Sequence, residues 1–193
     1  QAEYTIHLEL LNWLAADFMD SGWDVKRLLK TILSSETYQR SSATIHTDFR
    51  EIDPDNRMLA RGTRHRLPSW IIRDQALAAS GLLNARIGGP AFNAYQPPGI
   101  WEEATFGKKT YQQAKGEELY RRSLYVYWRR IVGPTMFFDV SKRQICDVKL
   151  ARTNTPMHAL TTLNDVTYVE AARHLAKRAL LTEDTLTDQL DFI

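Results

Sequence analysis

The sequence predicts a mainly α-helical protein, a single irregular helical domain with long loops that covers residues 1–193. Apolar residues recur at intervals of three and four in several stretches, which is the spacing of a helix with one buried face. Capping and turn-forming residues stand at the ends of these stretches. The sequence contains no internal repeat, low-complexity run or clear linker, and we therefore expect one domain.

The N-terminal part predicts two antiparallel helices joined by a short turn. Residues 7–20 carry apolar side chains at helical spacing, and Ser21 with Gly22 supplies a left-handed stop. Asp24 can cap the next helix, in which an apolar stripe lies opposite basic residues. The stripe consists of Val25, Leu28, Leu29, Ile32 and Leu33, and the basic residues are Lys26, Arg27 and Lys30. A further helical turn is expected at 35–40 and a loop at 41–53.

The middle of the chain predicts more helices separated by irregular segments. Asp53 and Pro54 favour a short helix over residues 54–60 that ends at Gly62. Residues 68–83 favour a helix whose small side chains let a second helix approach closely, so we place it at the centre of the core. Glycine and proline at both ends of residues 88–99 exclude regular structure there, and long connectors of this kind are often functional.

Residues 117–132 are open to two interpretations. Leu119, Leu124 and Ile131 fit a helix, whereas Leu124, Val126 and Trp128 also alternate as in a strand. We favour the helix, which would end at residues 133–134. Another helix is expected over residues 141–149.

The residues from 152 to 172 combine two helix starts. Thr155 before Pro156 predicts an N-cap followed by proline at the first helical position. Thr167 and Glu170 have the spacing of a capping box, which predicts a second helix directly afterwards. The inner faces are expected to hold Met157, Leu160 and Leu163 in the first helix and Val169, Ala172, Leu175, Ala176 and Ala179 in the second. A further helix begins in the tail from Thr182 and lacks a C-cap, so we expect the chain to be a fragment of a longer multidomain protein.

Composition excludes several functional classes. The net charge of +2 is small for a nucleic-acid binder, and no apolar run reaches the ~20 residues that a membrane span needs. The N-terminal residues do not follow the pattern of a signal peptide. Cys146 is the single cysteine, which rules out an internal disulfide, a multi-thiolate metal site and a C-x-x-C-H haem attachment. No histidine pair has metal-ligand spacing, and we expect no metal site.

Two arginine-containing segments are candidate anion-binding sites. Arg152, Asn154 and Thr155 precede a helix N-terminus, where free N–H groups and the helix dipole attract anions. Arg121 and Arg122 lie among tyrosines and form the second candidate. The alternative for the first segment is that Arg152 pairs with a carboxylate such as Asp139 or Asp165, while the polar residues only shape the turn.

Several blocks of the sequence match one known family in the same order along nearly the whole chain. These blocks are LLNWLAADFMDSGWDVKRLLKTILSSETYQRSS, DPDNRMLARG, IRDQALAASGLL, IGGP, YQPPGIWE, LYRRSLYVYW and RTNTPMHALTTLNDVTYVEAARHLA. The chain closely resembles the PSD-one domain, the C-terminal domain of a large family of planctomycete and related bacterial proteins. It departs from the family pattern at Leu8, where proline usually follows the histidine, and it lacks the usual C-terminal continuation.

The resemblance implies an exported, periplasmic or extracellular bacterial protein of several domains. Longer members of the family often carry a planctomycete-type cytochrome c module, so any haem c would belong to another module of the parent protein. The resemblance implies neither an established reaction nor catalytic residues. We expect an interaction or ligand-positioning module whose partners are other domains of the parent protein and an anionic or carbohydrate ligand. The alternative is an enzyme domain acting on an anionic or carbohydrate substrate, with an acid or base among Asp74, Asp139 and Asp165.

Overall fold

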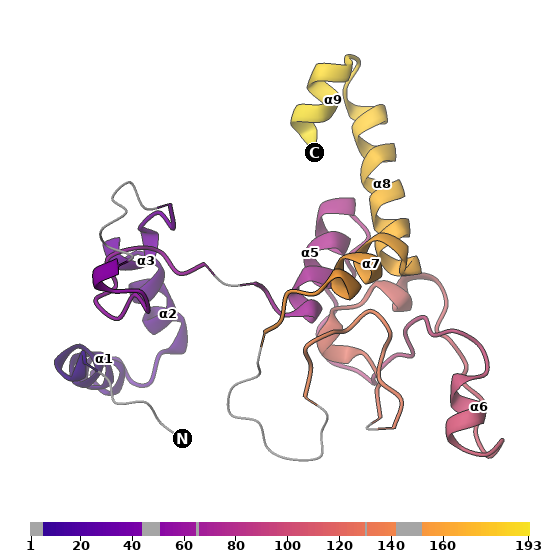
Figure 1. Ribbon diagram of the computed structural model, residues 1–193, viewed down its shortest axis with the longest axis horizontal. Coiled ribbons are helices and arrows are strands. Elements are labelled where there is room, and N and C mark those ends of the chain that lie inside the picture. The colour runs from indigo at the N-terminus through magenta and orange to yellow at the C-terminus, as the bar shows by residue number, and fades with distance from the viewer. Residues whose placement is uncertain (1–5, 44–50, 65, 130, 142–151) are drawn as a thin grey trace. The chain divides into compact units, whose positions relative to one another are not determined.

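A computed structural model describes residues 6–43, 51–64, 66–129, 131–141 and 152–193. Its described residues are mainly α-helical, as the sequence predicts. The chain divides into two compact units, Gln1–His65 and Arg66–Ile193, and each is described by itself (Figure 1). That the chain forms one domain stays a prediction.

The first unit contains the predicted helical pair. Helix α1 spans Leu8–Asp20, α2 spans Val25–Leu33 and the short α3 spans Glu36–Gln39. The left-handed turn between the first two lies at Gly22, whose φ is 71°. The Asp24 carboxylate accepts hydrogen bonds from the backbone N–H groups of Lys26 and Arg27 at 2.9 and 3.0 Å, which confirms the predicted cap.

The predicted helix at 54–60 is wrong, because a compact loop occupies these residues. The Asp53 carboxylate accepts from the N–H groups of Arg57 and Met58, at 2.8 and 2.7 Å, which lie four and five residues later and so beyond the positions that an N-cap contacts. Asn56 and Leu59 both have a φ of 54°, which an α-helix cannot contain. The Asp53 contacts therefore stabilise a loop and not a helix start.

The second unit is organised by α5 (Ser69–Ser80), which packs along α8 (Val166–Thr182) (Figure 1). The other helices of this unit are α6 (Ile100–Ala104), α7 (Pro156–Asn164) and α9 (Leu186–Phe192). Gly81 ends α5 at a φ of 76°, in the left-handed region that glycine adopts without steric cost. The buried apolar residues include Leu77, Phe92, Ala94, Met136 and Tyr168.

Residues 117–132 do not form the favoured helix. Two short 3-10 helices, Gly116–Tyr120 and Ser123–Tyr125, lead into extended backbone that pairs with the connector of residues 88–99. The N–H of Phe92 donates to the carbonyl of Tyr125 at 2.9 Å, and the N–H of Tyr127 donates to the carbonyl of Phe92 at 2.7 Å. The strand-like alternation is not confirmed either, because Leu124 lies in the second 3-10 helix and is exposed, and the extended backbone makes only isolated bridges. The helix expected over 141–149 lies outside the described residues apart from Ser141.

The starts of α7 and α8 are confirmed, but their caps and inner faces differ from the prediction. Thr155 makes no side-chain cap hydrogen bond, and Asp165 instead of Thr167 caps α8, accepting from the N–H of Thr167 at 2.9 Å. Glu170 accepts from the Tyr120 hydroxyl at 2.8 Å and so takes no part in a capping box. The buried residues of α8 are Tyr168, Ala171 and Ala179, whereas Val169, Met157, Leu160 and Leu163 are exposed.

A buried arginine joins α5 to the segment after the first 3-10 helix. Arg73 is 1% exposed, and its guanidinium donates to the carbonyls of Arg121 and Leu119 at 2.9 and 2.8 Å. Its Nη1 lies 3.5 Å from the carboxylate of Asp74, which accepts from the N–H and hydroxyl of Ser123 at 2.8 and 2.6 Å. Burial lowers the pKa of Arg73, although the Asp74 charge opposes this change. The guanidinium thus depends on these acceptors to compensate its lost hydration.

We expect Arg73→Ala to lower the free energy of unfolding by about 3 kcal/mol, since it leaves the Asp74 carboxylate and two carbonyls without their buried partner. Urea denaturation followed by circular dichroism measures this change. The exposed Arg122 provides the control, because Arg122→Ala removes the same charge without disturbing a buried network. Equal stability of the two variants would contradict a structural role for Arg73.

The two assignments of the α8 cap make opposite predictions. If Asp165 is the cap, Asp165→Ala costs about 1 kcal/mol of stability, while Thr167→Ala has a small effect. A capping box would reverse that order. The same urea measurement on both variants decides between them.

Candidate functional site

The residues around the start of α7 form a polar cluster, called here the Arg66 cluster: Arg66, Asp139, Thr153, Asn154 and His158. Arg66 comes just before α5, and His158 lies in the first turn of α7. Asp139 is brought close by the segment before it, because the hydroxyl of Ser69 donates to the carbonyl of Phe138 at 2.8 Å. Three distant stretches of the chain therefore meet at this point.

The arginine makes the central contacts of the Arg66 cluster. Its Nη1 lies 3.2 Å from Asn154 Oδ1, 3.3 Å from the carbonyl of Thr153 and 2.9 Å from His158 Nδ1. A guanidinium can only donate, so His158 Nδ1 accepts and the ring proton is assigned to Nε2. That nitrogen faces Asp139 Oδ1 at 3.7 Å. The histidine is 7% exposed, and its ring stacks on Phe138 with centroids 4.2 Å apart.

Asp139 is the anionic member of the Arg66 cluster. Its carboxylate accepts from the N–H and the hydroxyl of Thr153 at 2.7 and 2.8 Å. Burial alone would raise the pKa of Asp139, but the two hydrogen bonds from Thr153, together with the electrostatic influence of the neighbouring His158 and Arg66 side chains, outweigh it and lower that pKa below 3.8. Asp139 has a φ of 52°, a conformation that aspartate and asparagine tolerate better than most residues.

The first predicted site lies beside this cluster. Arg152 donates from Nη1 to the carbonyl of Arg66 at 2.8 Å, and Asn154 accepts from the Arg66 side chain. Thr155 provides the backbone carbonyl that the N–H of His158 contacts at 3.1 Å. Arg152 thus contacts a carbonyl, and in the described part of the chain it forms no ion pair with Asp139 or Asp165.

The second predicted site is placed differently. Arg121 is 0% exposed; its Nη1 donates to the carbonyl of Pro90 at 2.6 Å and its Nη2 to that of Gly88. Its guanidinium also lies 4.2 Å from the centre of the Tyr125 ring. The side chain therefore holds the connector in place, and only its neighbour Arg122 is exposed to solvent.

The three carboxylates considered as acid or base are all engaged by the fold. Asp74 contacts Arg73 and Ser123, and Asp139 accepts from Thr153. Asp165 caps α8 and also accepts from the hydroxyl of Thr135 at 3.2 Å. Each of these hydrogen bonds fixes the orientation of the carboxylate that accepts it.

Sequence reasoning missed Arg66 and His158. Both residues have only a weak signal, since an isolated histidine and one arginine of a basic run are more often surface residues. Among the described residues, no group of three or more His, Cys, Asp or Glu side chains is placed to hold a metal ion. A helix long and apolar enough to cross a membrane is likewise not found in these parts of the chain.

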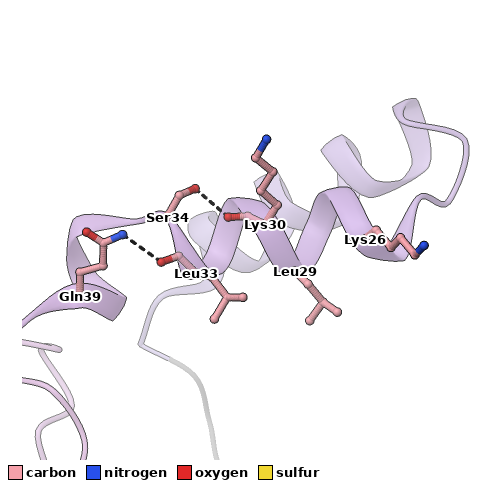
Figure 2. A pocket seen from close by; sticks show the side chains of 6 residues that line it. All are labelled: Lys26, Leu29, Lys30, Leu33, Ser34 and Gln39. Carbon is pink, nitrogen blue, oxygen red and sulfur yellow. Dashed lines mark hydrogen bonds between the residues drawn. The ribbon is translucent and has the colours of Figure 1, made fainter. Parts of the chain in front are cut away.

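The first unit offers a different kind of site, an apolar groove along α2 (Figure 2). Its volume is about 440 Å³, and Leu29 and Leu33 lie side by side on the helix where it opens. Gln39 closes one end by donating from Nε2 to the carbonyl of Leu33 at 3.1 Å. Lys26 and Lys30 also line the groove, which is therefore apolar with a basic border.

We expect Asp139→Asn to reduce the loss of folding stability that the chain undergoes at acidic pH. Because the folded-state pKa lies below the unfolded value of 3.8, the carboxylate stabilises the fold above that value and loses this effect as the pH falls through the folded-state pKa. The free energy of unfolding should fall less between about pH 6 and about pH 3 in the variant than in the parent chain. Urea denaturation at both pH values, with the exposed Asp184→Asn as control, measures this; equal slopes in all three chains would contradict it.

Comparison with known proteins gives one family. A family model described as "Protein of unknown function (DUF1553)", PSD1, matches residues 1–193, which is the whole chain. Neither the curated proteins nor the solved structures contain a match. The family model agrees with the resemblance carried by the sequence blocks, and the chain belongs to the PSD1 family of proteins of unknown function.

Proposed function

We propose that the chain acts as an interaction module of a larger exported bacterial protein and docks onto other domains of that protein. A haem group, where the parent protein has one, is carried by a separate cytochrome c module. In this proposal the export, the periplasmic or extracellular location and the link to planctomycete cytochromes follow from the family resemblance. The docking role rests on the surface of the first unit.

One observation carries the proposal: no described residue of positions 6–64 is buried. Leu29 is 52% exposed, Leu33 50%, Trp13 56% and Trp23 65%. Scattered apolar residues are ordinary on a protein surface, but contiguous apolar patches mark sites of contact with another molecule. On α2 the exposed apolar residues recur at helical spacing and so form one continuous stripe.

On α2 the exposed stripe comprises Val25, Leu29, Ile32 and Leu33, while Leu28 is half-buried. The stripe shares Leu29 and Leu33 with the groove of Figure 2, whose lining also includes Lys26 and Lys30. A surface of this chemistry fits a partner with apolar side chains at its centre and carboxylates around them. We therefore propose that the docking domain of the parent protein presents an apolar surface with an acidic rim.

An enzyme acting on an anionic or carbohydrate substrate is less well supported. The Arg66 cluster does hold an arginine, a histidine and a carboxylate close together. Yet Asp139 is bound by Thr153, and the histidine lies between Arg66 and Phe138, so these groups already satisfy one another. Their contacts account for a structural role in joining α7 to α5.

We expect Leu29→Glu to weaken binding to the rest of the parent protein by at least about tenfold, because it places a carboxylate in the apolar centre of the interface. Isothermal titration calorimetry with the rest of the parent protein as a separate chain measures the dissociation constant. Ile87→Glu is the matched control, since Ile87 is 82% exposed and lies in the second unit. Unchanged affinity in Leu29→Glu would argue against this surface as the interface.

A further inference from the structure

The loop of residues 53–64 encloses a second hollow in the first unit, distinct from the α2 groove. Its volume is about 740 Å³, within the range of pockets that hold small organic ligands. The lining contains Ser42 from the preceding segment together with Asp55, Arg61, Thr63 and Arg64 from the loop. Polar side chains therefore predominate here, in contrast to the leucines of the groove.

The walls of the hollow are held in place by hydrogen bonds within the loop. Asn56 donates from Nδ2 to the carbonyl of Arg61 at 2.7 Å and accepts from the N–H of the same residue at 3.2 Å. Arg61 donates from Nη2 to the carbonyls of Asp53 and Pro54 at 2.8 and 2.7 Å. These contacts fix Arg61 and Asn56 as parts of the frame.

Gly62 joins the loop to the preceding segment at residues 40 and 41. Its N–H donates to the carbonyl of Ser41 at 2.9 Å, and a Cβ at this glycine would lie 2.3 Å from the carbonyl oxygen of Arg40. The side chain of Arg40 donates in turn to the carbonyl of Leu59 at 2.9 Å. The hollow is thus preorganised, since both of its sides are tied to backbone groups.

Among the described residues, two charged side chains in the lining make no hydrogen bond that stabilises the loop. Arg64 and Asp55 are exposed, and neither contacts a hydrogen-bond or ion-pair partner in the described parts of the chain. The hydroxyl groups of Ser42 and Thr63 also line the hollow. A guanidinium binds a carboxylate in a bidentate manner, and a carboxylate accepts hydrogen bonds from ligand hydroxyl groups.

We propose that this hollow binds an acidic sugar, with Arg64 contacting the sugar carboxylate and Asp55 accepting from its hydroxyl groups. Pro54 and Leu59, which complete the lining, supply apolar surface for the C–H face of the ring. The volume exceeds what a single amino acid needs, which favours a sugar over a zwitterion that could also bridge the two charges. This proposal is independent of the docking role, because it uses none of the residues of the α2 groove.

The test compares two variants that remove the same charge from the same loop. Arg64→Gln alters the lining of the hollow, whereas Arg57→Gln alters an arginine outside it. In calorimetric titrations with glucuronate we expect binding to the parent chain and to Arg57→Gln, and at least about tenfold weaker binding to Arg64→Gln. Circular dichroism should show all three chains equally folded.

Four outcomes would overturn the proposal. Glucuronate could fail to bind the parent chain, or it could bind Arg64→Gln as tightly as Arg57→Gln, which would leave only a long-range charge effect. If the parent chain bound glucose as tightly as glucuronate, the carboxylate would not be recognised. If it bound alanine as tightly as glucuronate, the sugar ring would not be recognised. Weaker binding to Asp55→Asn than to the parent chain would support the assigned role of that carboxylate.

Discussion

The second unit depends on the guanidinium of Arg73, which lies in its interior as that of Arg121 also does. Arg73 is almost fully buried, and a buried cation is tolerated only where hydrogen-bond acceptors replace its water. In an α-helix the carbonyls of Leu119 and Arg121 would accept from N–H groups four residues later. Here both carbonyls accept from Arg73, and the N–H of Ser123 donates to Asp74. The backbone of residues 117–132 is therefore irregular. The connector of residues 88–99 pairs with this irregular segment.

The same constraint explains which parts of the fold could be predicted. The helices α1, α2, α5 and α8 follow from local patterns, because their starts, stops and apolar spacing lie within a few residues. The segment of residues 117–132 could not be predicted, since its conformation depends on Arg73, more than 40 residues earlier. Likewise the capping-box spacing of Thr167 and Glu170 is misleading, since Asp165 caps α8 and Glu170 accepts from Tyr120, 50 residues earlier.

The candidate site shows the same division between local and distant signals. Arg152, Asn154 and Thr155 stand out because they precede a helix start, and the structure does place them beside a polar cluster. Arg66 lies 86 residues from Arg152 and 92 from His158, so no local pattern could join them. The adjacent residues Arg121 and Arg122 predict a single site, but they differ in burial. Arg121 is buried and holds the connector in place, whereas Arg122 is exposed to solvent.

The first unit raises a different physical question, because its described helices α1, α2 and α3 form without burying a residue. Helices of nine and thirteen residues have little stability of their own, and most helical stability in proteins comes from packing of an apolar face. Ordering each residue costs about 1–2 kcal/mol of backbone entropy, which caps such as Asp24 cannot offset alone. A surface that covers the stripe of Val25, Leu29, Ile32 and Leu33 would supply the missing apolar burial. Folding and docking of this unit should accordingly be coupled, so that the partner stabilises the very helices to which it binds.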